Sequence, residues 1–388
     1  MSLSMSDGKV FMINTVSRIG YGIMVIAIPY YIPSHLAALV GVVLSAYPIA
    51  EALVSIPVGL MANRFKANYL VSIGVLVMSV SAVLFTVSNN WVTLTILHGV
   101  MGVAAALMTV PLLTLVAYRR IKLGLGYGGF FSTYFAGYII GIGVSGLMQR
   151  LISNSVEAAR VSMIIAAVTF LITLPIALML KGERNAKAPS RPRLRRSALT
   201  LFPLWLGIMI MLGIAFTLPT GLTTHLNISG AYVALIYVSA ALVLALGMMM
   251  FGALVDRIGA VRTIIIGLIG LVLIIGIAYL AVSGEISISS AIIPLAPSVL
   301  LASALVPSIY AYIGYRIEEG SEGLIMGVYN VPTAVGIAIG NLLGGFSVSH
   351  LGLGLTVTSA ALVLALSMLL TALLWVIQDA RSHINQPT

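Results

Sequence analysis

The chain has 388 residues, of which 60% are hydrophobic and 8% are charged, and its mean hydropathy is +1.12. A soluble domain is about 45–50% apolar, so this composition excludes a soluble protein and predicts one that crosses the membrane several times. The absence of cysteine excludes disulfide bonds and thiolate metal sites.

Repeated apolar segments are long enough to cross a hydrocarbon core of about 30 Å as helices. Helices are expected because backbone polar groups in lipid must be satisfied within each segment. The sequence therefore predicts an all-α polytopic membrane protein with twelve transmembrane helices. In chain order the predicted spans are Val10–Ile32, Leu36–Met61, Tyr69–Val87, Trp91–Tyr118, Leu125–Leu147, Val161–Leu180, Ala198–Thr220, Ala231–Val255, Thr263–Val282, Ile288–Tyr312, Leu324–Phe346 and Leu351–Ile377.

Positive charge is distributed unevenly between the predicted loops. If the N-terminus is cytoplasmic, all of the 20 Lys and Arg residues except Arg18, Arg150 and Arg160 lie in cytoplasmic segments. This asymmetry follows the positive-inside rule. It predicts a multi-pass cell-membrane protein with both termini in the cytoplasm, and it argues against nucleic-acid binding despite the net charge of +10. The basic run Lys181–Arg196 is expected to be a solvated loop near anionic lipid headgroups.

Two glycine-bounded, charged turns occur at matching places in the chain. The stretch "GLMANRFKANYLVSIG" (Gly59–Gly74) follows the second span, "GALVDRIGAVRTIIIG" (Gly252–Gly267) follows the eighth, and the two align without a gap. A second pair, "YRRIKLGLG" from Tyr118 and "YRIEEGSEG" from Tyr315, follows the fourth and tenth spans. Either turn alone could be a plain positive-inside loop, but the duplication indicates two related halves. We expect an N-terminal six-helix bundle over 1–180, a cytoplasmic basic linker over 181–197 and a C-terminal six-helix bundle over 198–388.

The second copy resembles a signature of the major facilitator superfamily of secondary transporters. That family carries Gly-x-x-x-Asp-Arg-x-Gly-x-Arg between its second and third helices and often repeats it weakly between the eighth and ninth. The matching residues here are Gly252, Asp256, Arg257, Gly259 and Arg262. The resemblance implies two pseudo-symmetric six-helix bundles, related by an axis along the membrane normal, around a central cavity that opens alternately to each side.

The first copy keeps Gly59 and Arg64 but departs from the signature at the acid, which Asn63 replaces. Phe65 and Lys66 then follow Arg64. In the family this motif forms a gate between the halves at the cytoplasmic surface. We therefore expect that gate to be weaker on the N-terminal side.

Three ionisable residues lie within predicted spans, where a charge costs at least about 2.5–3.5 kcal/mol on insertion scales. They are Arg18, Glu51 and His98. Arg18 and Glu51 lie at similar depths, roughly 12 Å from the cytoplasmic side at 1.5 Å per residue. They could form an ion pair that holds the first two spans together. Alternatively, Arg18 could hold a substrate anion while Glu51 binds a proton.

By the same resemblance, His98 occupies the arginine position of an Arg-x-x-Gln-Gly element that many proton-coupled members carry in the fourth helix, with Met101 at the glutamine position and Gly102 matching. Histidine titrates near pH 6.5, so His98 could load and release a proton; the alternative is a packing histidine bonded to a backbone carbonyl. Span five lacks the full Gly-Pro-x-x-Gly-Gly element of proton-driven drug exporters, because Tyr138 and Ile142 replace the proline and second glycine. That departure argues against a drug–proton antiporter.

Polar and aromatic side chains within the spans are candidates for lining a substrate cavity. In the eleventh span Tyr329 and Asn330 precede Pro332, which can free backbone groups for a ligand. Tyrosines also serve in packing and in interfacial belts, which is the alternative for each of them. The cavity candidates are Tyr21, Tyr47, Tyr134, Tyr310, Tyr329 and Asn330.

The sequence carries no zinc, nucleophile-elbow or phosphate-loop motif and does not indicate an enzyme. We expect a secondary active transporter of a small organic solute, coupled to protons through Glu51 and His98, with export and uptake both open. The alternative is a non-transporting membrane receptor or lipid-interacting protein on the same fold. The expected partners are a small-molecule substrate, protons and membrane lipids, with no nucleic acid, metal or other cofactor, and we expect a monomer.

Overall fold

The computed structural model describes residues 5–32, 38–88, 90–118, 120, 122–180, 193–194, 196–226 and 229–384. Within these residues the fold is all-helical, with twelve spans long and apolar enough to cross a membrane. The predicted linker 181–197 lies mostly outside the described residues. The helices are α1 (Met5–Ala27), the short η1 (Ile28–Tyr31), α2 (Ala38–Arg64), α3 (Ala67–Val87), α4 (Trp91–Ala117), α5 (Leu123–Leu151), α6 (Ser155–Leu178), η3 (Arg196–Ala198), α7 (Phe202–His225), α8 (Gly230–Ile258), α9 (Ala260–Val282), α10 (Ile288–Ala302), α11 (Leu305–Gly314), α12 (Glu322–His350) and α13 (Gly352–Ile384).

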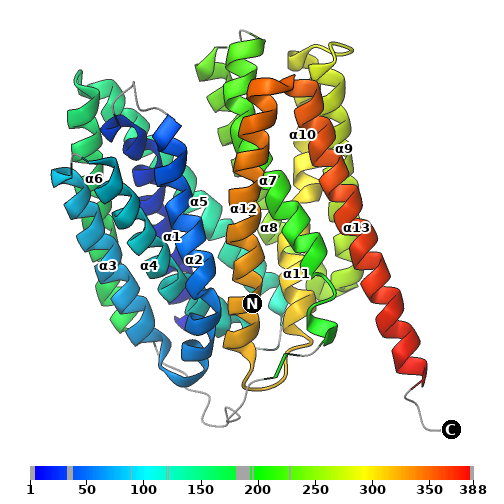
Figure 1. Cartoon of the computed structure of the whole chain (residues 1–388). Helices are drawn as coiled ribbons and strands as arrows, with labels where there is room; N and C mark the ends of the chain where they lie inside the picture. The colour runs from blue at the N-terminus through cyan, green and yellow to red at the C-terminus, as the bar shows by residue number, and fades with distance from the viewer. Residues whose placement is uncertain are drawn as a thin grey trace.

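The helices form two groups, α1–α6 and α7–α13, each packed mainly within itself (Figure 1). The main contacts between the groups are made by α2 with α12, α5 with α8, α5 with α11, and α4 with α12. These contacts gather at the end of the molecule that carries the α2–α3 and α8–α9 turns, which we call the turn end. Figure 1 shows the two groups diverging toward the opposite end. The described conformation is therefore closed at the turn end.

The two repeated turns lie at the same end of the molecule, as their alignment predicts. The Tyr315 hydroxyl contacts Asp256 in the second turn. The Gly323 amide, a few residues further along the chain, contacts Asn63 in the first. One short connection, between α11 and α12, thus reaches both turns.

Four helices that begin at the opposite end, α4, α6, α8 and α10, carry their own side-chain caps. The residues Asn90, Asn154, Ser229 and Ser287 each accept a hydrogen bond from an amide in the first turn of α4, α6, α8 or α10. Two helices that begin at the turn end, α5 and α12, have no such cap of their own. Because the first amides of a helix have no intrahelical partner, those of α5 and α12 need acceptors from elsewhere in the fold.

The tenth predicted span, Ile288–Tyr312, is present in the structure as one apolar span, Ile288–Gly314, but it consists of two helices. In the structure α10 ends at Ala302 and α11 begins at Leu305. Pro307 has no amide hydrogen to donate to the Ser303 carbonyl, so the helical ladder is interrupted there. Hydropathy counts apolar length, which the break does not change, and so it could not reveal the interruption.

Candidate functional site

Glycine backbones bring the two halves into direct contact at the turn end. A Cβ on Gly59 of α2 would collide with the Gly323 carbonyl of α12. A Cβ on Gly124 of α5 would likewise collide with the Gly252 carbonyl of α8. Small residues permit this approach between membrane helices. The closed end is thus built from two equivalent glycine crossings, α2 with α12 and α8 with α5.

Asp256, at the end of α8, supplies the missing cap of α5 in the other half. Its Oδ1 accepts from the Gly124 amide at 2.8 Å and its Oδ2 from the Leu125 amide at 2.9 Å. The Tyr315 hydroxyl donates to Oδ1 at 3.2 Å. Partial burial raises the pKa of the Tyr315 hydroxyl above its usual range, and the Asp256 carboxylate raises it further. The carboxylate therefore links the halves by binding a helix N-terminus, where negative charge is favoured.

Asn63, at the end of α2, has the equivalent role toward α12. Its Oδ1 accepts from the Gly323 amide at 2.7 Å. The first copy therefore caps a helix of the opposite half although it lacks the acid. The Asn63 amide oxygen makes one uncharged hydrogen bond to a backbone amide, whereas the Asp256 carboxylate makes two charged ones. This difference is a physical reason to expect the weaker gate on the N-terminal side.

The remaining residues of the repeated motif serve the turns. Gly259 has φ +91°, a left-handed conformation that a side chain would strain, and it joins α8 to α9. Arg64, Arg257 and Arg262 are exposed. Among the described residues no ion pair joins Asp256 to Arg257, and the acid bonds to backbone amides.

A second polar connection crosses between the halves deeper in the molecule. The side-chain nitrogen of Asn330 in α12 donates to Glu51 Oε1 of α2 at 2.9 Å and to Ser55 Oγ at 2.9 Å. Glu51, Ser55 and Asn330 are all buried, at 9%, 0% and 3% exposure. A carboxylate inside the membrane is thus bound directly by the opposite half.

Arg18 lies near Glu51 but bonds to other groups. Its Nη2 donates to Thr109 Oγ1 at 2.7 Å and its Nη1 lies 3.5 Å from the Tyr47 hydroxyl. The guanidinium carbon lies 4.0 Å from the ring centre of Tyr134. The structure shows no Arg18–Glu51 ion pair among the described residues. The two charges still interact electrostatically. Tyr47, which bonds to Arg18, lies one helical turn from Glu51 on α2.

His98 of α4 is completely buried beneath an aromatic stack. Its Nδ1 lies 2.8 Å from the Val43 carbonyl, which is the packing arrangement weighed in the sequence analysis. Its ring centre lies 5.2 Å from that of Tyr47, which itself stacks on Tyr21 at 4.4 Å. Nε2 has no hydrogen-bond partner among the described residues. His98 therefore packs against Tyr47, which in turn bonds to Arg18. Among the described residues His98 makes no hydrogen bond to Arg18 or Glu51.

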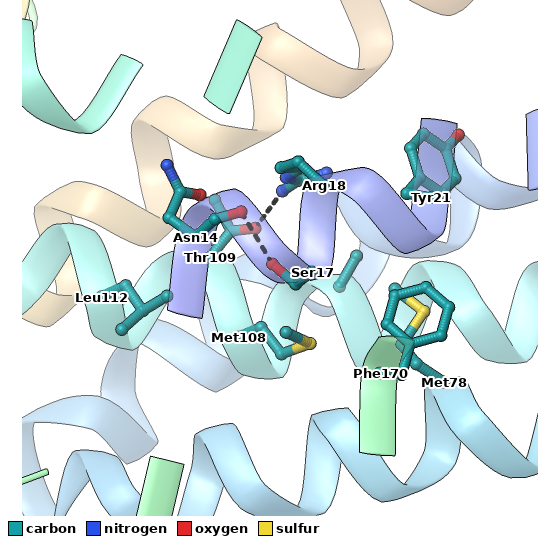
Figure 2. Close-up of a pocket in the computed structure, with 10 residues that line it drawn as sticks. Asn14, Ser17, Arg18, Tyr21, Met78, Met108, Thr109, Leu112 and Phe170 are labelled. Atoms are coloured by element: carbon teal, nitrogen blue, oxygen red, sulfur yellow. Dashed lines mark hydrogen bonds between the residues drawn. The ribbon is translucent and has the colours of Figure 1, made fainter. Parts of the chain in front are cut away.

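A small pocket adjoins Arg18 inside the N-terminal half (Figure 2). Asn14, Ser17, Arg18 and Thr109 give it a polar side, and the opposite side is apolar, formed in part by Met78, Met108, Leu112 and Phe170. Figure 2 shows Arg18 reaching from α1 to Thr109 on α4. The pocket has room for water rather than for an organic solute.

Three of the tyrosine cavity candidates, Tyr47, Tyr310 and Tyr329, are buried in packed surroundings in this conformation. Tyr310 is 1% exposed and contacts the rings of Phe131 and Trp205. Tyr329 is fully buried and its hydroxyl donates to the Ala198 carbonyl at 2.6 Å. Tyr21 and Tyr134 instead keep part of their surface accessible. The partly accessible tyrosine candidates therefore both belong to the N-terminal half.

The structure adds residues that the sequence reasoning missed. Ser55 shares a face of α2 with Tyr47 and Glu51, at a spacing of four that places side chains one above another. Thr109 follows His98 by about three helical turns on α4. Both Ser55 and Thr109 lie a whole number of helical turns from an ionisable residue in the same span, and this spacing is the sequence signal that could have identified them. Arg120 and Glu322 form a further inter-half ion pair at 2.8 Å, for which spacing gave no signal.

Comparison with known proteins decides the family. The sequence model of the Major Facilitator Superfamily matches residues 10–220 and again residues 198–388. The chain belongs to the Major Facilitator Superfamily. The first match runs from α1 into α7, and the second runs from the start of the second helix group to the end of the chain.

Individual relatives agree with the superfamily assignment. "Multidrug resistance protein 2" of Bacillus subtilis (strain 168) is 22% identical over 376 residues, covering 89% of this chain and 90% of the relative. The human organic anion transporter MFSD10 (TETRAN) superposes with a TM-score of 0.74 at 14% identity, covering 94% of this chain and 98% of that one. The Escherichia coli fucose:proton symporter superposes with a TM-score of 0.72 at 12% identity, covering 95% and 98%. The likeness to the solved structures establishes the superfamily fold, a multi-pass transporter architecture.

Proposed function

We propose that this superfamily member is a secondary active transporter of a small organic solute, coupled to protons through Glu51. The observation that carries the proposal is the hydrogen bond from Asn330 to Glu51, because it joins a titratable group within the membrane to the opposite half. Any change in the charge of Glu51 then acts directly on a contact that holds α2 of one half against α12 of the other.

The physical basis is the difference between charged and neutral hydrogen bonds. A hydrogen bond to an ionised group contributes about 1.5–3 kcal/mol, against about 0.5–1.5 kcal/mol for a neutral pair. Protonating Glu51 therefore weakens its bond to Asn330 and favours opening of the turn end. Opening of the turn end exposes Glu51 to the solution on that side of the membrane, where it can release the proton. This sequence gives alternating access driven by a proton gradient.

The positive-inside asymmetry supports a cytoplasmic location for both termini and hence for the turn end. With that orientation the described conformation is closed toward the cytoplasm. The relatives' names refer to multidrug resistance, organic anions, and fucose with protons. They support transport as the activity without selecting one substrate. The proposal covers either direction, since secondary transport follows the gradients imposed.

Reconstituted vesicles with an internal pH dye test the proposal. Gradients of sugars, amino acids, carboxylates and amines are imposed in turn across the membrane of vesicles that contain the purified protein. We expect one of these solute classes to move protons. Glu51→Gln should abolish uphill accumulation driven by a pH difference and leave downhill exchange of the same solute. Glu157→Gln is the matched control, because Glu157 is an exposed carboxylate on α6. Uphill accumulation by Glu51→Gln, or no proton movement with any class, would contradict the proposal.

A further inference from the structure

The guanidinium of Arg18 is buried and forms no ion pair with any residue that the structure describes. Arg18 is only 6% exposed. The described hydrogen-bond partners of its guanidinium, Thr109 and Tyr47, are neutral. A guanidinium has five N–H donors, and the structure accounts for two of them. A buried charge is stable only when it is paired or richly hydrogen-bonded, so this group is suited to a further anionic partner.

The surroundings of Arg18 fit a flat solute. Tyr134 presents its ring face to the guanidinium. Tyr21 lies with its ring centre 6.0 Å from that of Tyr138, on α5, and all three tyrosines are half-buried. The C-terminal half has no acidic residue, basic residue or histidine in the interior of its spans. Charge recognition must therefore come from the N-terminal half.

From these observations we infer that the transported solute is a small planar monocarboxylate, whose carboxylate binds Arg18 and whose body packs against Tyr21, Tyr134 and Tyr138. The inference rests on the proposed transport function and names its substrate class. The water-sized pocket beside Arg18 is too small for the solute body. The solute binds instead on the accessible side of the tyrosines, and its carboxylate completes the hydrogen bonding of the guanidinium.

Charge balance ties one proton to each bound anion. In the empty site the positive Arg18 and the negative Glu51 offset one another. Adding an anion leaves a net negative charge in a low-dielectric region, and uptake of a proton by Glu51 removes it. The titratable and charged groups that sense Glu51 are Arg18 and Tyr21 of α1, Tyr47 of α2, Tyr134 of α5 and Tyr310 of α11. Anion and proton therefore bind cooperatively, and transport of a monocarboxylate carries no net charge.

Equilibrium binding to the purified full chain tests the inference without any gradient. The probes are benzoate, benzamide and benzamidinium, which share a ring and differ in charge. Benzoate should bind most tightly, and its Kd should rise by up to about tenfold per pH unit as the solution becomes alkaline, the slope for one linked proton. In Glu51→Gln the Kd for benzoate should be independent of pH, because the permanently neutral amide replaces the proton.

Variants at Arg18 separate charge recognition from folding. Arg18→Gln should weaken benzoate binding by roughly tenfold or more, as expected for a lost charge-assisted hydrogen bond, and should leave benzamide binding nearly unchanged. Arg18→Lys keeps the charge and should lose less. Arg160→Gln removes an exposed positive charge on α6 and is the matched control. Thermal unfolding of each variant establishes that it is folded.

Two results would overturn the inference. One is that the wild type binds benzamide or benzamidinium as tightly as it binds benzoate, or that it binds no benzoate at millimolar concentration. The other is that benzoate binding by the wild type does not depend on pH. Neither result bears on proton-coupled transport of a different solute in vesicles, so a failure here is distinguishable from a failure of the proposed function.

Discussion

Replacing Asp256 by asparagine tests how strongly the turn end is held closed. The carboxylate caps α5 through two amides, at 2.8 and 2.9 Å. An asparagine keeps one acceptor oxygen, but its NH₂ group faces the second amide and cannot accept from it. The substitution therefore removes one charge-assisted hydrogen bond and the attraction between a negative charge and the helix N-terminus.

The size of the effect follows from those two losses. A hydrogen bond to a charged group contributes about 1.5–3 kcal/mol, and a charge at an exposed helix terminus about 0.3–1 kcal/mol. Because Asp256 is only partly buried, we take the lower ends of both ranges. The loss is then about 2 kcal/mol, which lowers the ratio of closed to open molecules by roughly thirtyfold.

Distances between spin labels across the turn end measure that ratio. The chain has no native cysteine, so Tyr69→Cys on α3 and Val261→Cys on α9 provide two unique label positions, both exposed. A longer distance should become populated in Asp256→Asn. Glu285→Gln is the control, since Glu285 is an exposed acid between α9 and α10. An unchanged distance distribution in Asp256→Asn would show that the cap does not set the conformational equilibrium.

Three further substitutions probe other contacts of the closed conformation. Gly59→Ala should open the turn end, because its Cβ collides with the Gly323 carbonyl, whereas Gly41→Ala in the same helix meets nothing within 4 Å and should leave the label distances unchanged. His98→Phe should lower the unfolding temperature by several degrees through the lost hydrogen bond and leave the pH dependence of transport intact; a lost pH dependence would make His98 the proton carrier. Asn330→Leu should reduce pH-driven accumulation at least fivefold in vesicle flux measurements, and full accumulation would exclude the inter-half bond as the coupling element.

The sequence by itself determined the membrane spans and the two repeated turns. Span length is fixed by the thickness of the hydrocarbon core, and turn residues such as Gly259 are fixed by local backbone geometry. Both signals are local, so they can be read in order along the chain. The same locality accounts for the missed break at Ser303, where the interruption depends on Pro307 and the apolar length does not change.

Only the tertiary structure decided which partner each buried polar group takes. Glu51 and Arg18 lie at similar depths and could have formed a pair, but Glu51 binds Asn330, 279 positions away, and Arg18 binds Thr109. In the same way Asp256 caps α5 across the halves instead of bonding to the adjacent Arg257. A hydrogen bond requires its atoms to approach within about 3 Å in a suitable direction. Which groups meet that condition depends on how the two halves pack, and the spacing of residues along one helix does not specify that packing.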